Sequence, residues 1–262
     1  MMKNIFKIAL ALALAIGISA CNGAPTPAPK KMASIVEKGE LVLGTSRNMT
    51  PMTRSIDNGK DAIGFDIDLA RSMAQTMGVK LVIKIMPLDK LVDAVANGEV
   101  DIVLSNMTIT PERNKKVIFV GPYITSSKCL VTKIPDLAKS TKEELNIAKN
   151  KMAVIKGSTS EEFVKEGMPL VEAVSVATQE EAITMVREAK VAALLSESPV
   201  CKAIIMNNPD DEFISVFTNL TYDPIGVAIA PENTHLQNWV QNYLVRAEKV
   251  GFLEVLAHKW FK

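Results

Sequence analysis

The chain has 262 residues, with 30 basic and 29 acidic side chains and a formal net charge of +1. This balance gives no support for binding to nucleic acid or to another polyanion, so we expect no nucleic-acid partner. Hydrophobic residues make up 48% of the chain, which is enough for a sizeable core, and the length suits one large domain or two modest ones.

The N-terminus has the features of an export signal. Lys3 and Lys7 are followed by an apolar run from Ile8 to Ile18, which is too short to span a bilayer comfortably. The run ends in Ile18-Ser19-Ala20-Cys21, which resembles the cleavage box of bacterial lipoproteins. The resemblance implies a signal peptide over residues 1–20 and a lipid such as palmitate on the Cys21 sulfur. The alternative is an ordinary signal peptide with a chance cysteine.

A tether is predicted over residues 21–31, because three prolines alternate there with small residues. We therefore expect the mature protein in the periplasm or at the cell surface, anchored to a membrane through Cys21. In that compartment Cys129 and Cys201 are permitted to form a disulfide. Both lie in apolar segments, and two cysteines do not make a disulfide framework. We expect buried free thiols, with a disulfide as the alternative.

Strands and helices alternate through the first hundred residues of the folded body, which starts near Met32. A short helix ends at Gly39, and apolar runs predict strands over residues 41–45, 80–85 and 102–104. Apolar residues at helical spacing predict a helix after Gly64, and a second helix is expected over residues 88–96. Residues 46–60 are expected to form a loop. The pattern βαβαβ favours a parallel sheet with right-handed crossovers.

The stretch Asp101–Arg113 combines a buried strand with the start of a helix. Thr110 is the expected N-cap and Pro111 the first helical residue. Ligands of parallel α/β sheets bind where strand turns into helix. The free N–H groups of a helix start attract anions, and Arg113 adds a forked, permanent cation. The stretch is therefore predicted to hold a small carboxylate.

A second α/β unit is expected after a crossing near residues 125–127. Strands are predicted over residues 128–132, 152–155, 171–176 and 191–195, with helices over 141–145, 178–190 and 199–206. The chain then returns to the first unit through a strand over residues 225–230 and helices over 233–249 and 252–260. Two α/β lobes of similar plan imply a ligand cleft between them.

Five segments resemble the family 3 solute-binding proteins, the periplasmic amino-acid-binding components of ABC importers. They are Gly64–Ala70, Gly98–Ile102, Met107–Arg113, Gly157–Glu161 and Ser196–Pro199. The resemblance implies two Rossmann-like α/β lobes joined by a two-strand hinge, which close on a ligand as in type II periplasmic binding proteins. Lobe 1 would comprise residues 32–126 and 219–262, and lobe 2 residues 127–218.

The resemblance also assigns roles to site residues. The α-carboxylate of the ligand would pair with Arg113 and accept from Thr108, and its α-ammonium would meet the Asn106 carbonyl and Glu197. A turn in lobe 2 would cap the carboxylate with Ser158, Thr159 and Ser160. Three residues would lie around the ligand's side chain: Ser46, Met49 and Leu88.

Several positions depart from the family pattern. Met49 and Met52 replace common aromatic residues, Ser46 stands where some members have an acid, and Glu197 is longer than the usual aspartate. Asp66 and Asp68 do not suggest a metal pair, because capping and dipole effects at a helix start explain them. We expect neither a metal nor a cofactor.

The sequence therefore predicts a monomeric extracytoplasmic lipoprotein that delivers an amino acid or close analogue to an ABC permease. One alternative is an enzyme that resembles the cyclohexadienyl dehydratases, which act on prephenate or arogenate, with Glu197 as general acid. A second alternative is a ligand-sensing protein for a separate membrane receptor.

Overall fold

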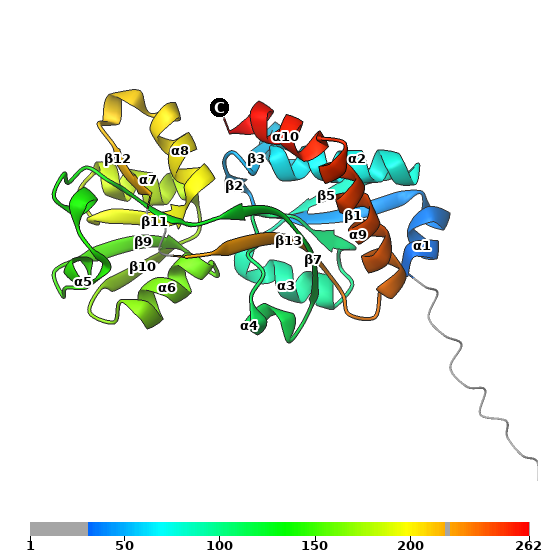
Figure 1. Cartoon of the computed structure of the whole chain (residues 1–262), viewed down its shortest axis with the longest axis horizontal. Helices are drawn as coiled ribbons and strands as arrows, with labels where there is room; N and C mark the ends of the chain where they lie inside the picture. Colours follow the sequence, from blue (N-terminus) through cyan, green and yellow to red (C-terminus); the bar gives the residue numbers. More distant parts are fainter. Residues whose placement is uncertain (1–30, 218–220, 262) are drawn as a thin grey trace, which may run out of the picture.

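The computed structural model describes residues 31–217 and 221–261, so the predicted signal peptide, Cys21 and most of the tether lie outside the described residues. The described chain forms two α/β bodies that lie side by side, each with its own five-stranded sheet (Figure 1). We call them lobe 1, which contains β1, β5, β6, β7 and β13, and lobe 2, which contains β8 to β12.

The sheet of lobe 1 is mixed, with two parallel and two antiparallel strand pairings. Its strands, in spatial order, are β5 (Lys80–Ile85), β1 (Glu40–Thr45), β6 (Ile102–Val103), β13 (Asp223–Ile229) and β7 (Ile118–Ser126). Helices α2 (Phe65–Met77) and α3 (Leu88–Ala96) connect the parallel strands β1, β5 and β6, which confirms the predicted alternation. Strand β13 runs antiparallel to both of its neighbours and comes from a distant part of the sequence.

The remaining helices of lobe 1 lie at its start, beside β7 and at the C-terminus. They are α1 (Lys31–Lys38), α4 (Pro111–Asn114), α9 (Thr234–Lys249) and α10 (Phe252–Trp260). Figure 1 shows α9 and α10 on the same side of the sheet as α2.

The prediction of a loop over residues 46–60 was wrong in part. The segment forms strands β2 (Asn48–Met49) and β3 (Thr53–Ile56) and a 3₁₀ turn, Asp57–Gly59, before β4 (Asp61–Ile63). These strands make a small antiparallel sheet. Asn58 and Gly59 have φ of 54° and 88°, which lets the chain reverse tightly. The strands are too short and too polar to show a two-residue hydrophobic repeat.

The sheet of lobe 2 has the spatial order β10-β9-β11-β8-β12. Its strands are β8 (Lys128–Thr132), β9 (Lys151–Ile155), β10 (Glu172–Val176), β11 (Ala193–Glu197) and β12 (Ile214–Phe217). Its helices are α5 (Lys142–Leu145), α6 (Thr159–Gly167), α7 (Gln179–Arg187) and α8 (Ser198–Asn207), with 3₁₀ turns at Leu137–Lys139 and Pro209–Asp211.

The expectation of free thiols was wrong, because Cys129 and Cys201 form a disulfide. Cys129 lies in β8, and Cys201 lies in α8, which follows the neighbouring strand β11. Their Cα atoms are 6.4 Å apart, within the range that a disulfide spans. Seventy-two positions separate them in sequence, so only the folded pairing of β8 with β11 brings them together.

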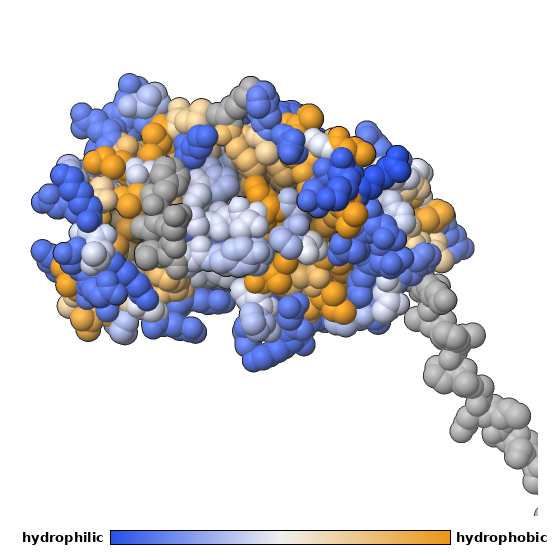
Figure 2. All heavy atoms as spheres, viewed as in Figure 1, coloured by the Kyte–Doolittle hydropathy of each residue, from blue (hydrophilic) through white to orange (hydrophobic). Residues whose placement is uncertain are grey.

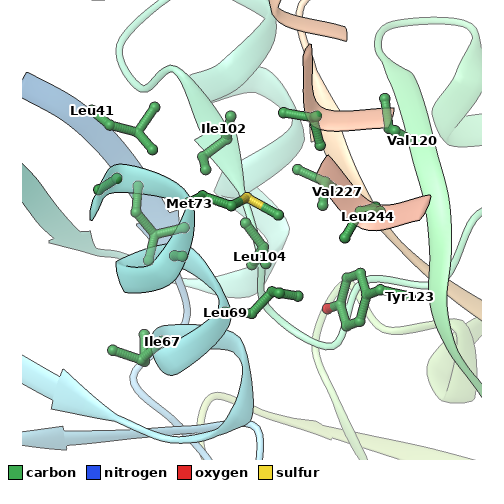
Figure 3. Packing of buried hydrophobic residues seen from close by; sticks show 14 of the residues in the cluster. Leu41, Ile67, Leu69, Met73, Ile102, Leu104, Val120, Tyr123, Val227 and Leu244 are labelled. Carbon is green, nitrogen blue, oxygen red and sulfur yellow. The ribbon is translucent and has the colours of Figure 1, made fainter. Parts of the chain in front are cut away.

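The lobes meet along two strands and a shared apolar cluster. Strand β7 ends at Ser126 and β8 begins at Lys128, while Asp223 at the start of β13 pairs with Ser126. The core of lobe 1 is separate and gathers side chains of α2 against the strands, with Leu69 and Met73 facing Ile102 and Val227 (Figure 3). The shared cluster includes Met49 and Leu88 from lobe 1 and Ile155 and Val176 from lobe 2.

The large apolar side chains that stay exposed belong to several separate elements. They include Ile134, Leu170, Met206, Tyr222, Val245, Val250 and Val255. On the face shown in Figure 2, hydrophilic residues cover much of both lobes, and apolar residues form small patches among the hydrophilic ones.

Candidate ligand-binding site

The buried carboxylate of Asp66 holds the turn after β6 in place. The N–H of Asn106 donates to Asp66 Oδ2 at 2.7 Å, and the hydroxyl of Tyr123 donates to Asp66 Oδ1 at 2.7 Å. Burial raises the pKa of Asp66 to about 7, although both hydrogen bonds act to lower it. Burial and the neighbouring Asp66 raise the pKa of Tyr123 well above its usual value. Asn106 has a positive φ of 49°, and its buried side chain reaches lobe 2, where Nδ2 donates to Glu197.

The role predicted for Asp66 and Asp68 was therefore incomplete. Both lie in the first turn of α2, where a negative charge suits the helix dipole, but neither caps the helix through its side chain. Asp66 holds the Asn106 turn, and Asp68 accepts from Lys259 at 2.6 Å and from Trp260 Nε1 at 2.9 Å. Each carboxylate joins α2 to a distant segment. Among the described residues, no three acidic, histidine or cysteine side chains are grouped to hold a metal ion.

Arg113 lies where lobe 1 meets lobe 2. The predicted helix start is confirmed, because Thr110 Oγ1 accepts the N–H of Arg113 at 3.2 Å and Pro111 follows the cap. The guanidinium donates through Nη1 to the Thr108 carbonyl at 2.8 Å and through Nη2 to the Gly157 carbonyl at 2.9 Å. Burial lowers the pKa of Arg113, while Glu162 and Glu197 act in the opposite direction. One side chain thus spans both lobes.

The start of α6 presents hydroxyl groups to Arg113 and its neighbours. Ser158 caps the helix by accepting the N–H of Glu161 at 3.1 Å. The Thr159 hydroxyl lies 3.3 Å from that of Thr108 across the two lobes, and Ser160 donates to Glu197 Oε1 at 3.0 Å. Of the three hydroxyl residues expected on this turn, Thr159 and Ser160 therefore meet Thr108 and Glu197, whereas the Ser158 hydroxyl caps its own helix.

Glu197, at the end of β11, accepts four hydrogen bonds. Oε1 accepts from Lys128 Nζ at 3.0 Å and from Ser160, while Oε2 accepts from Asn106 Nδ2 at 3.2 Å and from Ser196 at 3.3 Å. Burial raises the pKa of Glu197, but the charge of Lys128 and the hydrogen bonds from Lys128, Ser160 and Ser196 outweigh it, so the pKa is lowered. Glu197 is held as a carboxylate at neutral pH.

Lys128 was not predicted as a site residue. Its side chain is 1% exposed. Nζ also donates to Asp223 Oδ2 at 3.1 Å and to Thr159 Oγ1 at 2.7 Å, so Lys128 connects lobe 2 to the start of β13. The sequence contained one hint, because a lysine begins an otherwise apolar strand. The pairing of Lys128 with Glu197 follows from the antiparallel register of β8 and β11.

The other three predicted residues line a separate cavity of about 220 Å³ between the lobes. Ser46, Met49 and Leu88 are among its lobe 1 walls, and Ile155, Ala177 and Thr178 form the lobe 2 wall. Ser46 also donates its N–H to Ser105 Oγ at 2.9 Å. The ten predicted residues thus form two groups at the junction of the lobes: seven around Arg113 and Glu197, and three at this cavity.

The architecture of two α/β lobes joined through paired strands, with a polar site between them, is that of a type II periplasmic binding protein. The model of the bacterial extracellular solute-binding proteins, family 3, matches residues 41–262. The chain belongs to this family, as the sequence resemblance predicted. Within the described residues, no helix has the length and apolar character needed to cross a membrane.

Relatives and solved structures agree with this membership. The chain is 27% identical to the ABC transporter arginine-binding protein 1 of Escherichia coli (strain K12), over 87% of this chain and 93% of that protein. It is 26% identical to the ABC transporter glutamine-binding protein GlnH of Bacillus subtilis (strain 168), over 100% of this chain and 98% of that protein.

The similar structures include an ancestral amino acid-binding protein described as a precursor of cyclohexadienyl dehydratase. It has 35% identity and a TM-score of 0.81, and the match covers 88% of this chain and 100% of that one. Another is AbpA of Streptococcus pneumoniae bound to L-arginine, with 28% identity, a TM-score of 0.80 and coverage of 87% and 97%.

Proposed function

We propose that this protein captures an amino acid or a close analogue between its two lobes and delivers it to the permease of an ABC importer. The observation that carries the proposal is the position of Arg113, whose guanidinium donates to a carbonyl of each lobe. A forked cation at that position suits a carboxylate that both lobes must contact. Relatives that bind arginine, glutamine and cystine support the same class of ligand.

An amino acid carries a carboxylate and an ammonium group, and the surrounding residues divide between these two groups. Arg113, Thr108 and the hydroxyl turn of α6 (Ser158, Thr159 and Ser160) would hold the carboxylate. Glu197 and Asn106 would face the ammonium. Asn106 Oδ1 is buried and accepts no hydrogen bond from the described residues, so it supplies an acceptor besides the Asn106 carbonyl. A ligand held from both lobes favours the closed arrangement through contacts that an open one lacks.

Replacing Arg113 by alanine tests the proposal. The variant loses two or more charge-assisted hydrogen bonds to the ligand, at about 1.5–3 kcal/mol each. We expect amino-acid affinity to fall more than about 100-fold in titration calorimetry of the purified chain against the common amino acids. Arg246→Ala, at an exposed position of α9, is the matched control and should bind as the wild type does. Undiminished affinity in Arg113→Ala would contradict the proposal.

The ionisation of Glu197 supports binding rather than catalysis. A dehydratase that resembles the cyclohexadienyl enzymes would need this residue protonated, to donate a proton to a leaving group. Lys128, Ser160 and Ser196 instead hold the pKa of Glu197 below its usual value. We therefore expect no turnover of prephenate in an absorbance assay, and turnover that Glu197→Gln abolishes would contradict this conclusion.

The lipid anchor and the lobe boundaries belong to the same proposal. We place lobe 1 at residues 32–126 and 219–262 and lobe 2 at residues 127–218, behind a signal peptide over residues 1–20 and a tether over 21–31. The exposed apolar side chains come from several distant parts of the sequence, mostly in helices and in connecting segments, which fits a monomer. Cys21→Ser should move the protein from the membrane fraction to the soluble fraction of expressing cells. An unchanged distribution, with no lipid mass on the mature chain, would refute the anchor.

A further inference from the structure

The cavity between the lobes adjoins the Arg113 site. Gly157, whose carbonyl accepts from Arg113, lies against Asp89, so close that a Cβ on Gly157 would be 2.7 Å from the Asp89 Cα. The neighbouring residues Leu88 and Ile155 form facing walls of the cavity. A ligand whose carboxylate meets Arg113 therefore has this cavity beside it for its side chain.

The walls of the cavity are largely apolar. Its apolar side chains come from both lobes and are Met49, Ile85, Met86, Pro87, Leu88 and Ile155. The three that meet between the lobes are nearly closed off from solvent, with exposures of 5% for Met49, 8% for Leu88 and 9% for Ile155. Ser46, Asn48 and Thr178 supply uncharged polar groups. Removing an apolar ligand side chain from water here is favourable, whereas burying a charged one needs a partner.

No carboxylate lines the cavity. The one charged residue among its lining residues is Arg47, which is exposed. Its guanidinium lies beside Gly59, outside the lining, because a Cβ on Gly59 would be 3.7 Å from both Nη atoms. Asp89, which follows the lining residue Leu88, is paired with Lys156 at 3.0 Å. A cationic ligand side chain would meet no opposite charge in the lining.

From this distribution of charge we infer that the protein takes amino acids with apolar side chains and discriminates against arginine and lysine, although several of its relatives bind arginine. The inference rests on the proposed function. It assigns Met49, Leu88 and Ile155 to the recognition of the side chain. Because the enclosed walls are apolar and offer no charged partner, the structure favours an apolar side chain over a charged one of either sign.

Titration calorimetry of the purified full chain at neutral pH tests this specificity with four ligands: L-leucine, L-methionine, L-arginine and L-glutamate. We expect leucine or methionine to bind at least about tenfold more tightly than arginine and glutamate. Arg47→Glu places a shorter, negatively charged side chain on a residue that lines the cavity and should raise arginine affinity about tenfold or more relative to leucine. Arg246→Glu makes the same charge change on α9, away from the cavity, and should leave the ratio unchanged.

The outcomes separate this inference from the proposed function. Preferred binding of arginine or glutamate, lost in Arg113→Ala, would overturn the apolar specificity and leave the amino-acid site intact. An equal change of the arginine-to-leucine ratio in Arg47→Glu and Arg246→Glu would also overturn it, because the effect would then reflect net charge. Binding of no amino acid, by the wild type or by Arg47→Glu, would refute both conclusions.

Discussion

Asp66 combines complete burial with a structural task in the binding-site turn. Its side chain is 0% exposed, and its two oxygens accept the hydroxyl of Tyr123 and the N–H of Asn106. Burial disfavours the ionised form, and the pKa of Asp66 is accordingly raised from 3.8 to about 7. Between these two pKa values the folded protein keeps a proton on Asp66, whereas the unfolded chain has already released it.

This raised pKa predicts a pH dependence of stability that belongs to one residue. Because the folded pKa lies above the unfolded value, the stabilising contribution is complete below about pH 4 and is lost as the pH rises towards 7. The loss is at most about 1.4 kcal/mol per pH unit. In urea unfolding at pH 5 and pH 7, Asp66→Asn should lose less free energy of unfolding than the wild type does. An identical pH dependence in both proteins would contradict the assignment.

Tyr123→Phe provides a second measurement of the same effect. The substitution removes a hydrogen bond that lowers the pKa of Asp66, so that pKa should rise further. The pH interval over which stability is lost should then extend upwards. A shift in the opposite direction would show that Tyr123 does not act through Asp66.

Site residues differ in how far the sequence predicts them. Arg113 could be predicted because Thr110, Pro111 and the helix start stand next to it in the chain. Lys128 could not, because its partners Glu197 and Asp223 are 69 and 95 positions away and meet it only through strand register. Local patterns identify residues whose partners are local.

Helices and strands are likewise predicted best where the signals that define them are local in the sequence. The strand over residues 80–85 and the helices over 88–96 and 252–260 were predicted with the bounds that the structure shows, because hydrophobic spacing and helix stops define them locally. The helix predicted to reach Lys190 ends at Arg187, and Ala189 beyond it has a φ of 55°. The small sheet over residues 48–63 was missed because its strands depend on pairing with one another.

The disulfide joins two elements that the sequence places far apart. The segments around Cys129 and Cys201 were both correctly predicted as apolar and buried. What the sequence did not contain is the adjacency of β8 and α8, which arises when β11 inserts between β9 and β8. The bond lies one residue from Lys128 and four from Glu197, so it ties β8, which carries Lys128, to the helix that directly follows Glu197.

At the scale of the whole molecule, the two lobes are held together by polar contacts around Arg113 and by the apolar cluster beneath them. Arg113 to Gly157, Thr108 to Thr159, Asn106 to Glu197 and Asp89 to Lys156 all join lobe 1 to lobe 2. The structure is therefore a closed arrangement, and its closure requires close backbone approach at Gly157. Steric bulk at that residue should act on closure rather than on folding.

Gly157→Ala tests this dependence, with Gly98→Ala as its control. Both glycines have left-handed φ values, 77° and 75°, so alanine costs about 1–2 kcal/mol of backbone strain at either position. Only at Gly157 would the new Cβ clash, at 2.7 Å from Asp89; at Gly98 it would meet no heavy atom within 4 Å. We expect both variants to lose similar stability, but only Gly157→Ala to lose about tenfold or more in amino-acid affinity and to show a larger radius of gyration by small-angle X-ray scattering with excess ligand. Equal affinities in the two variants would mean that closure tolerates the clash, and the lobes would then not need to meet at Gly157 to hold the ligand.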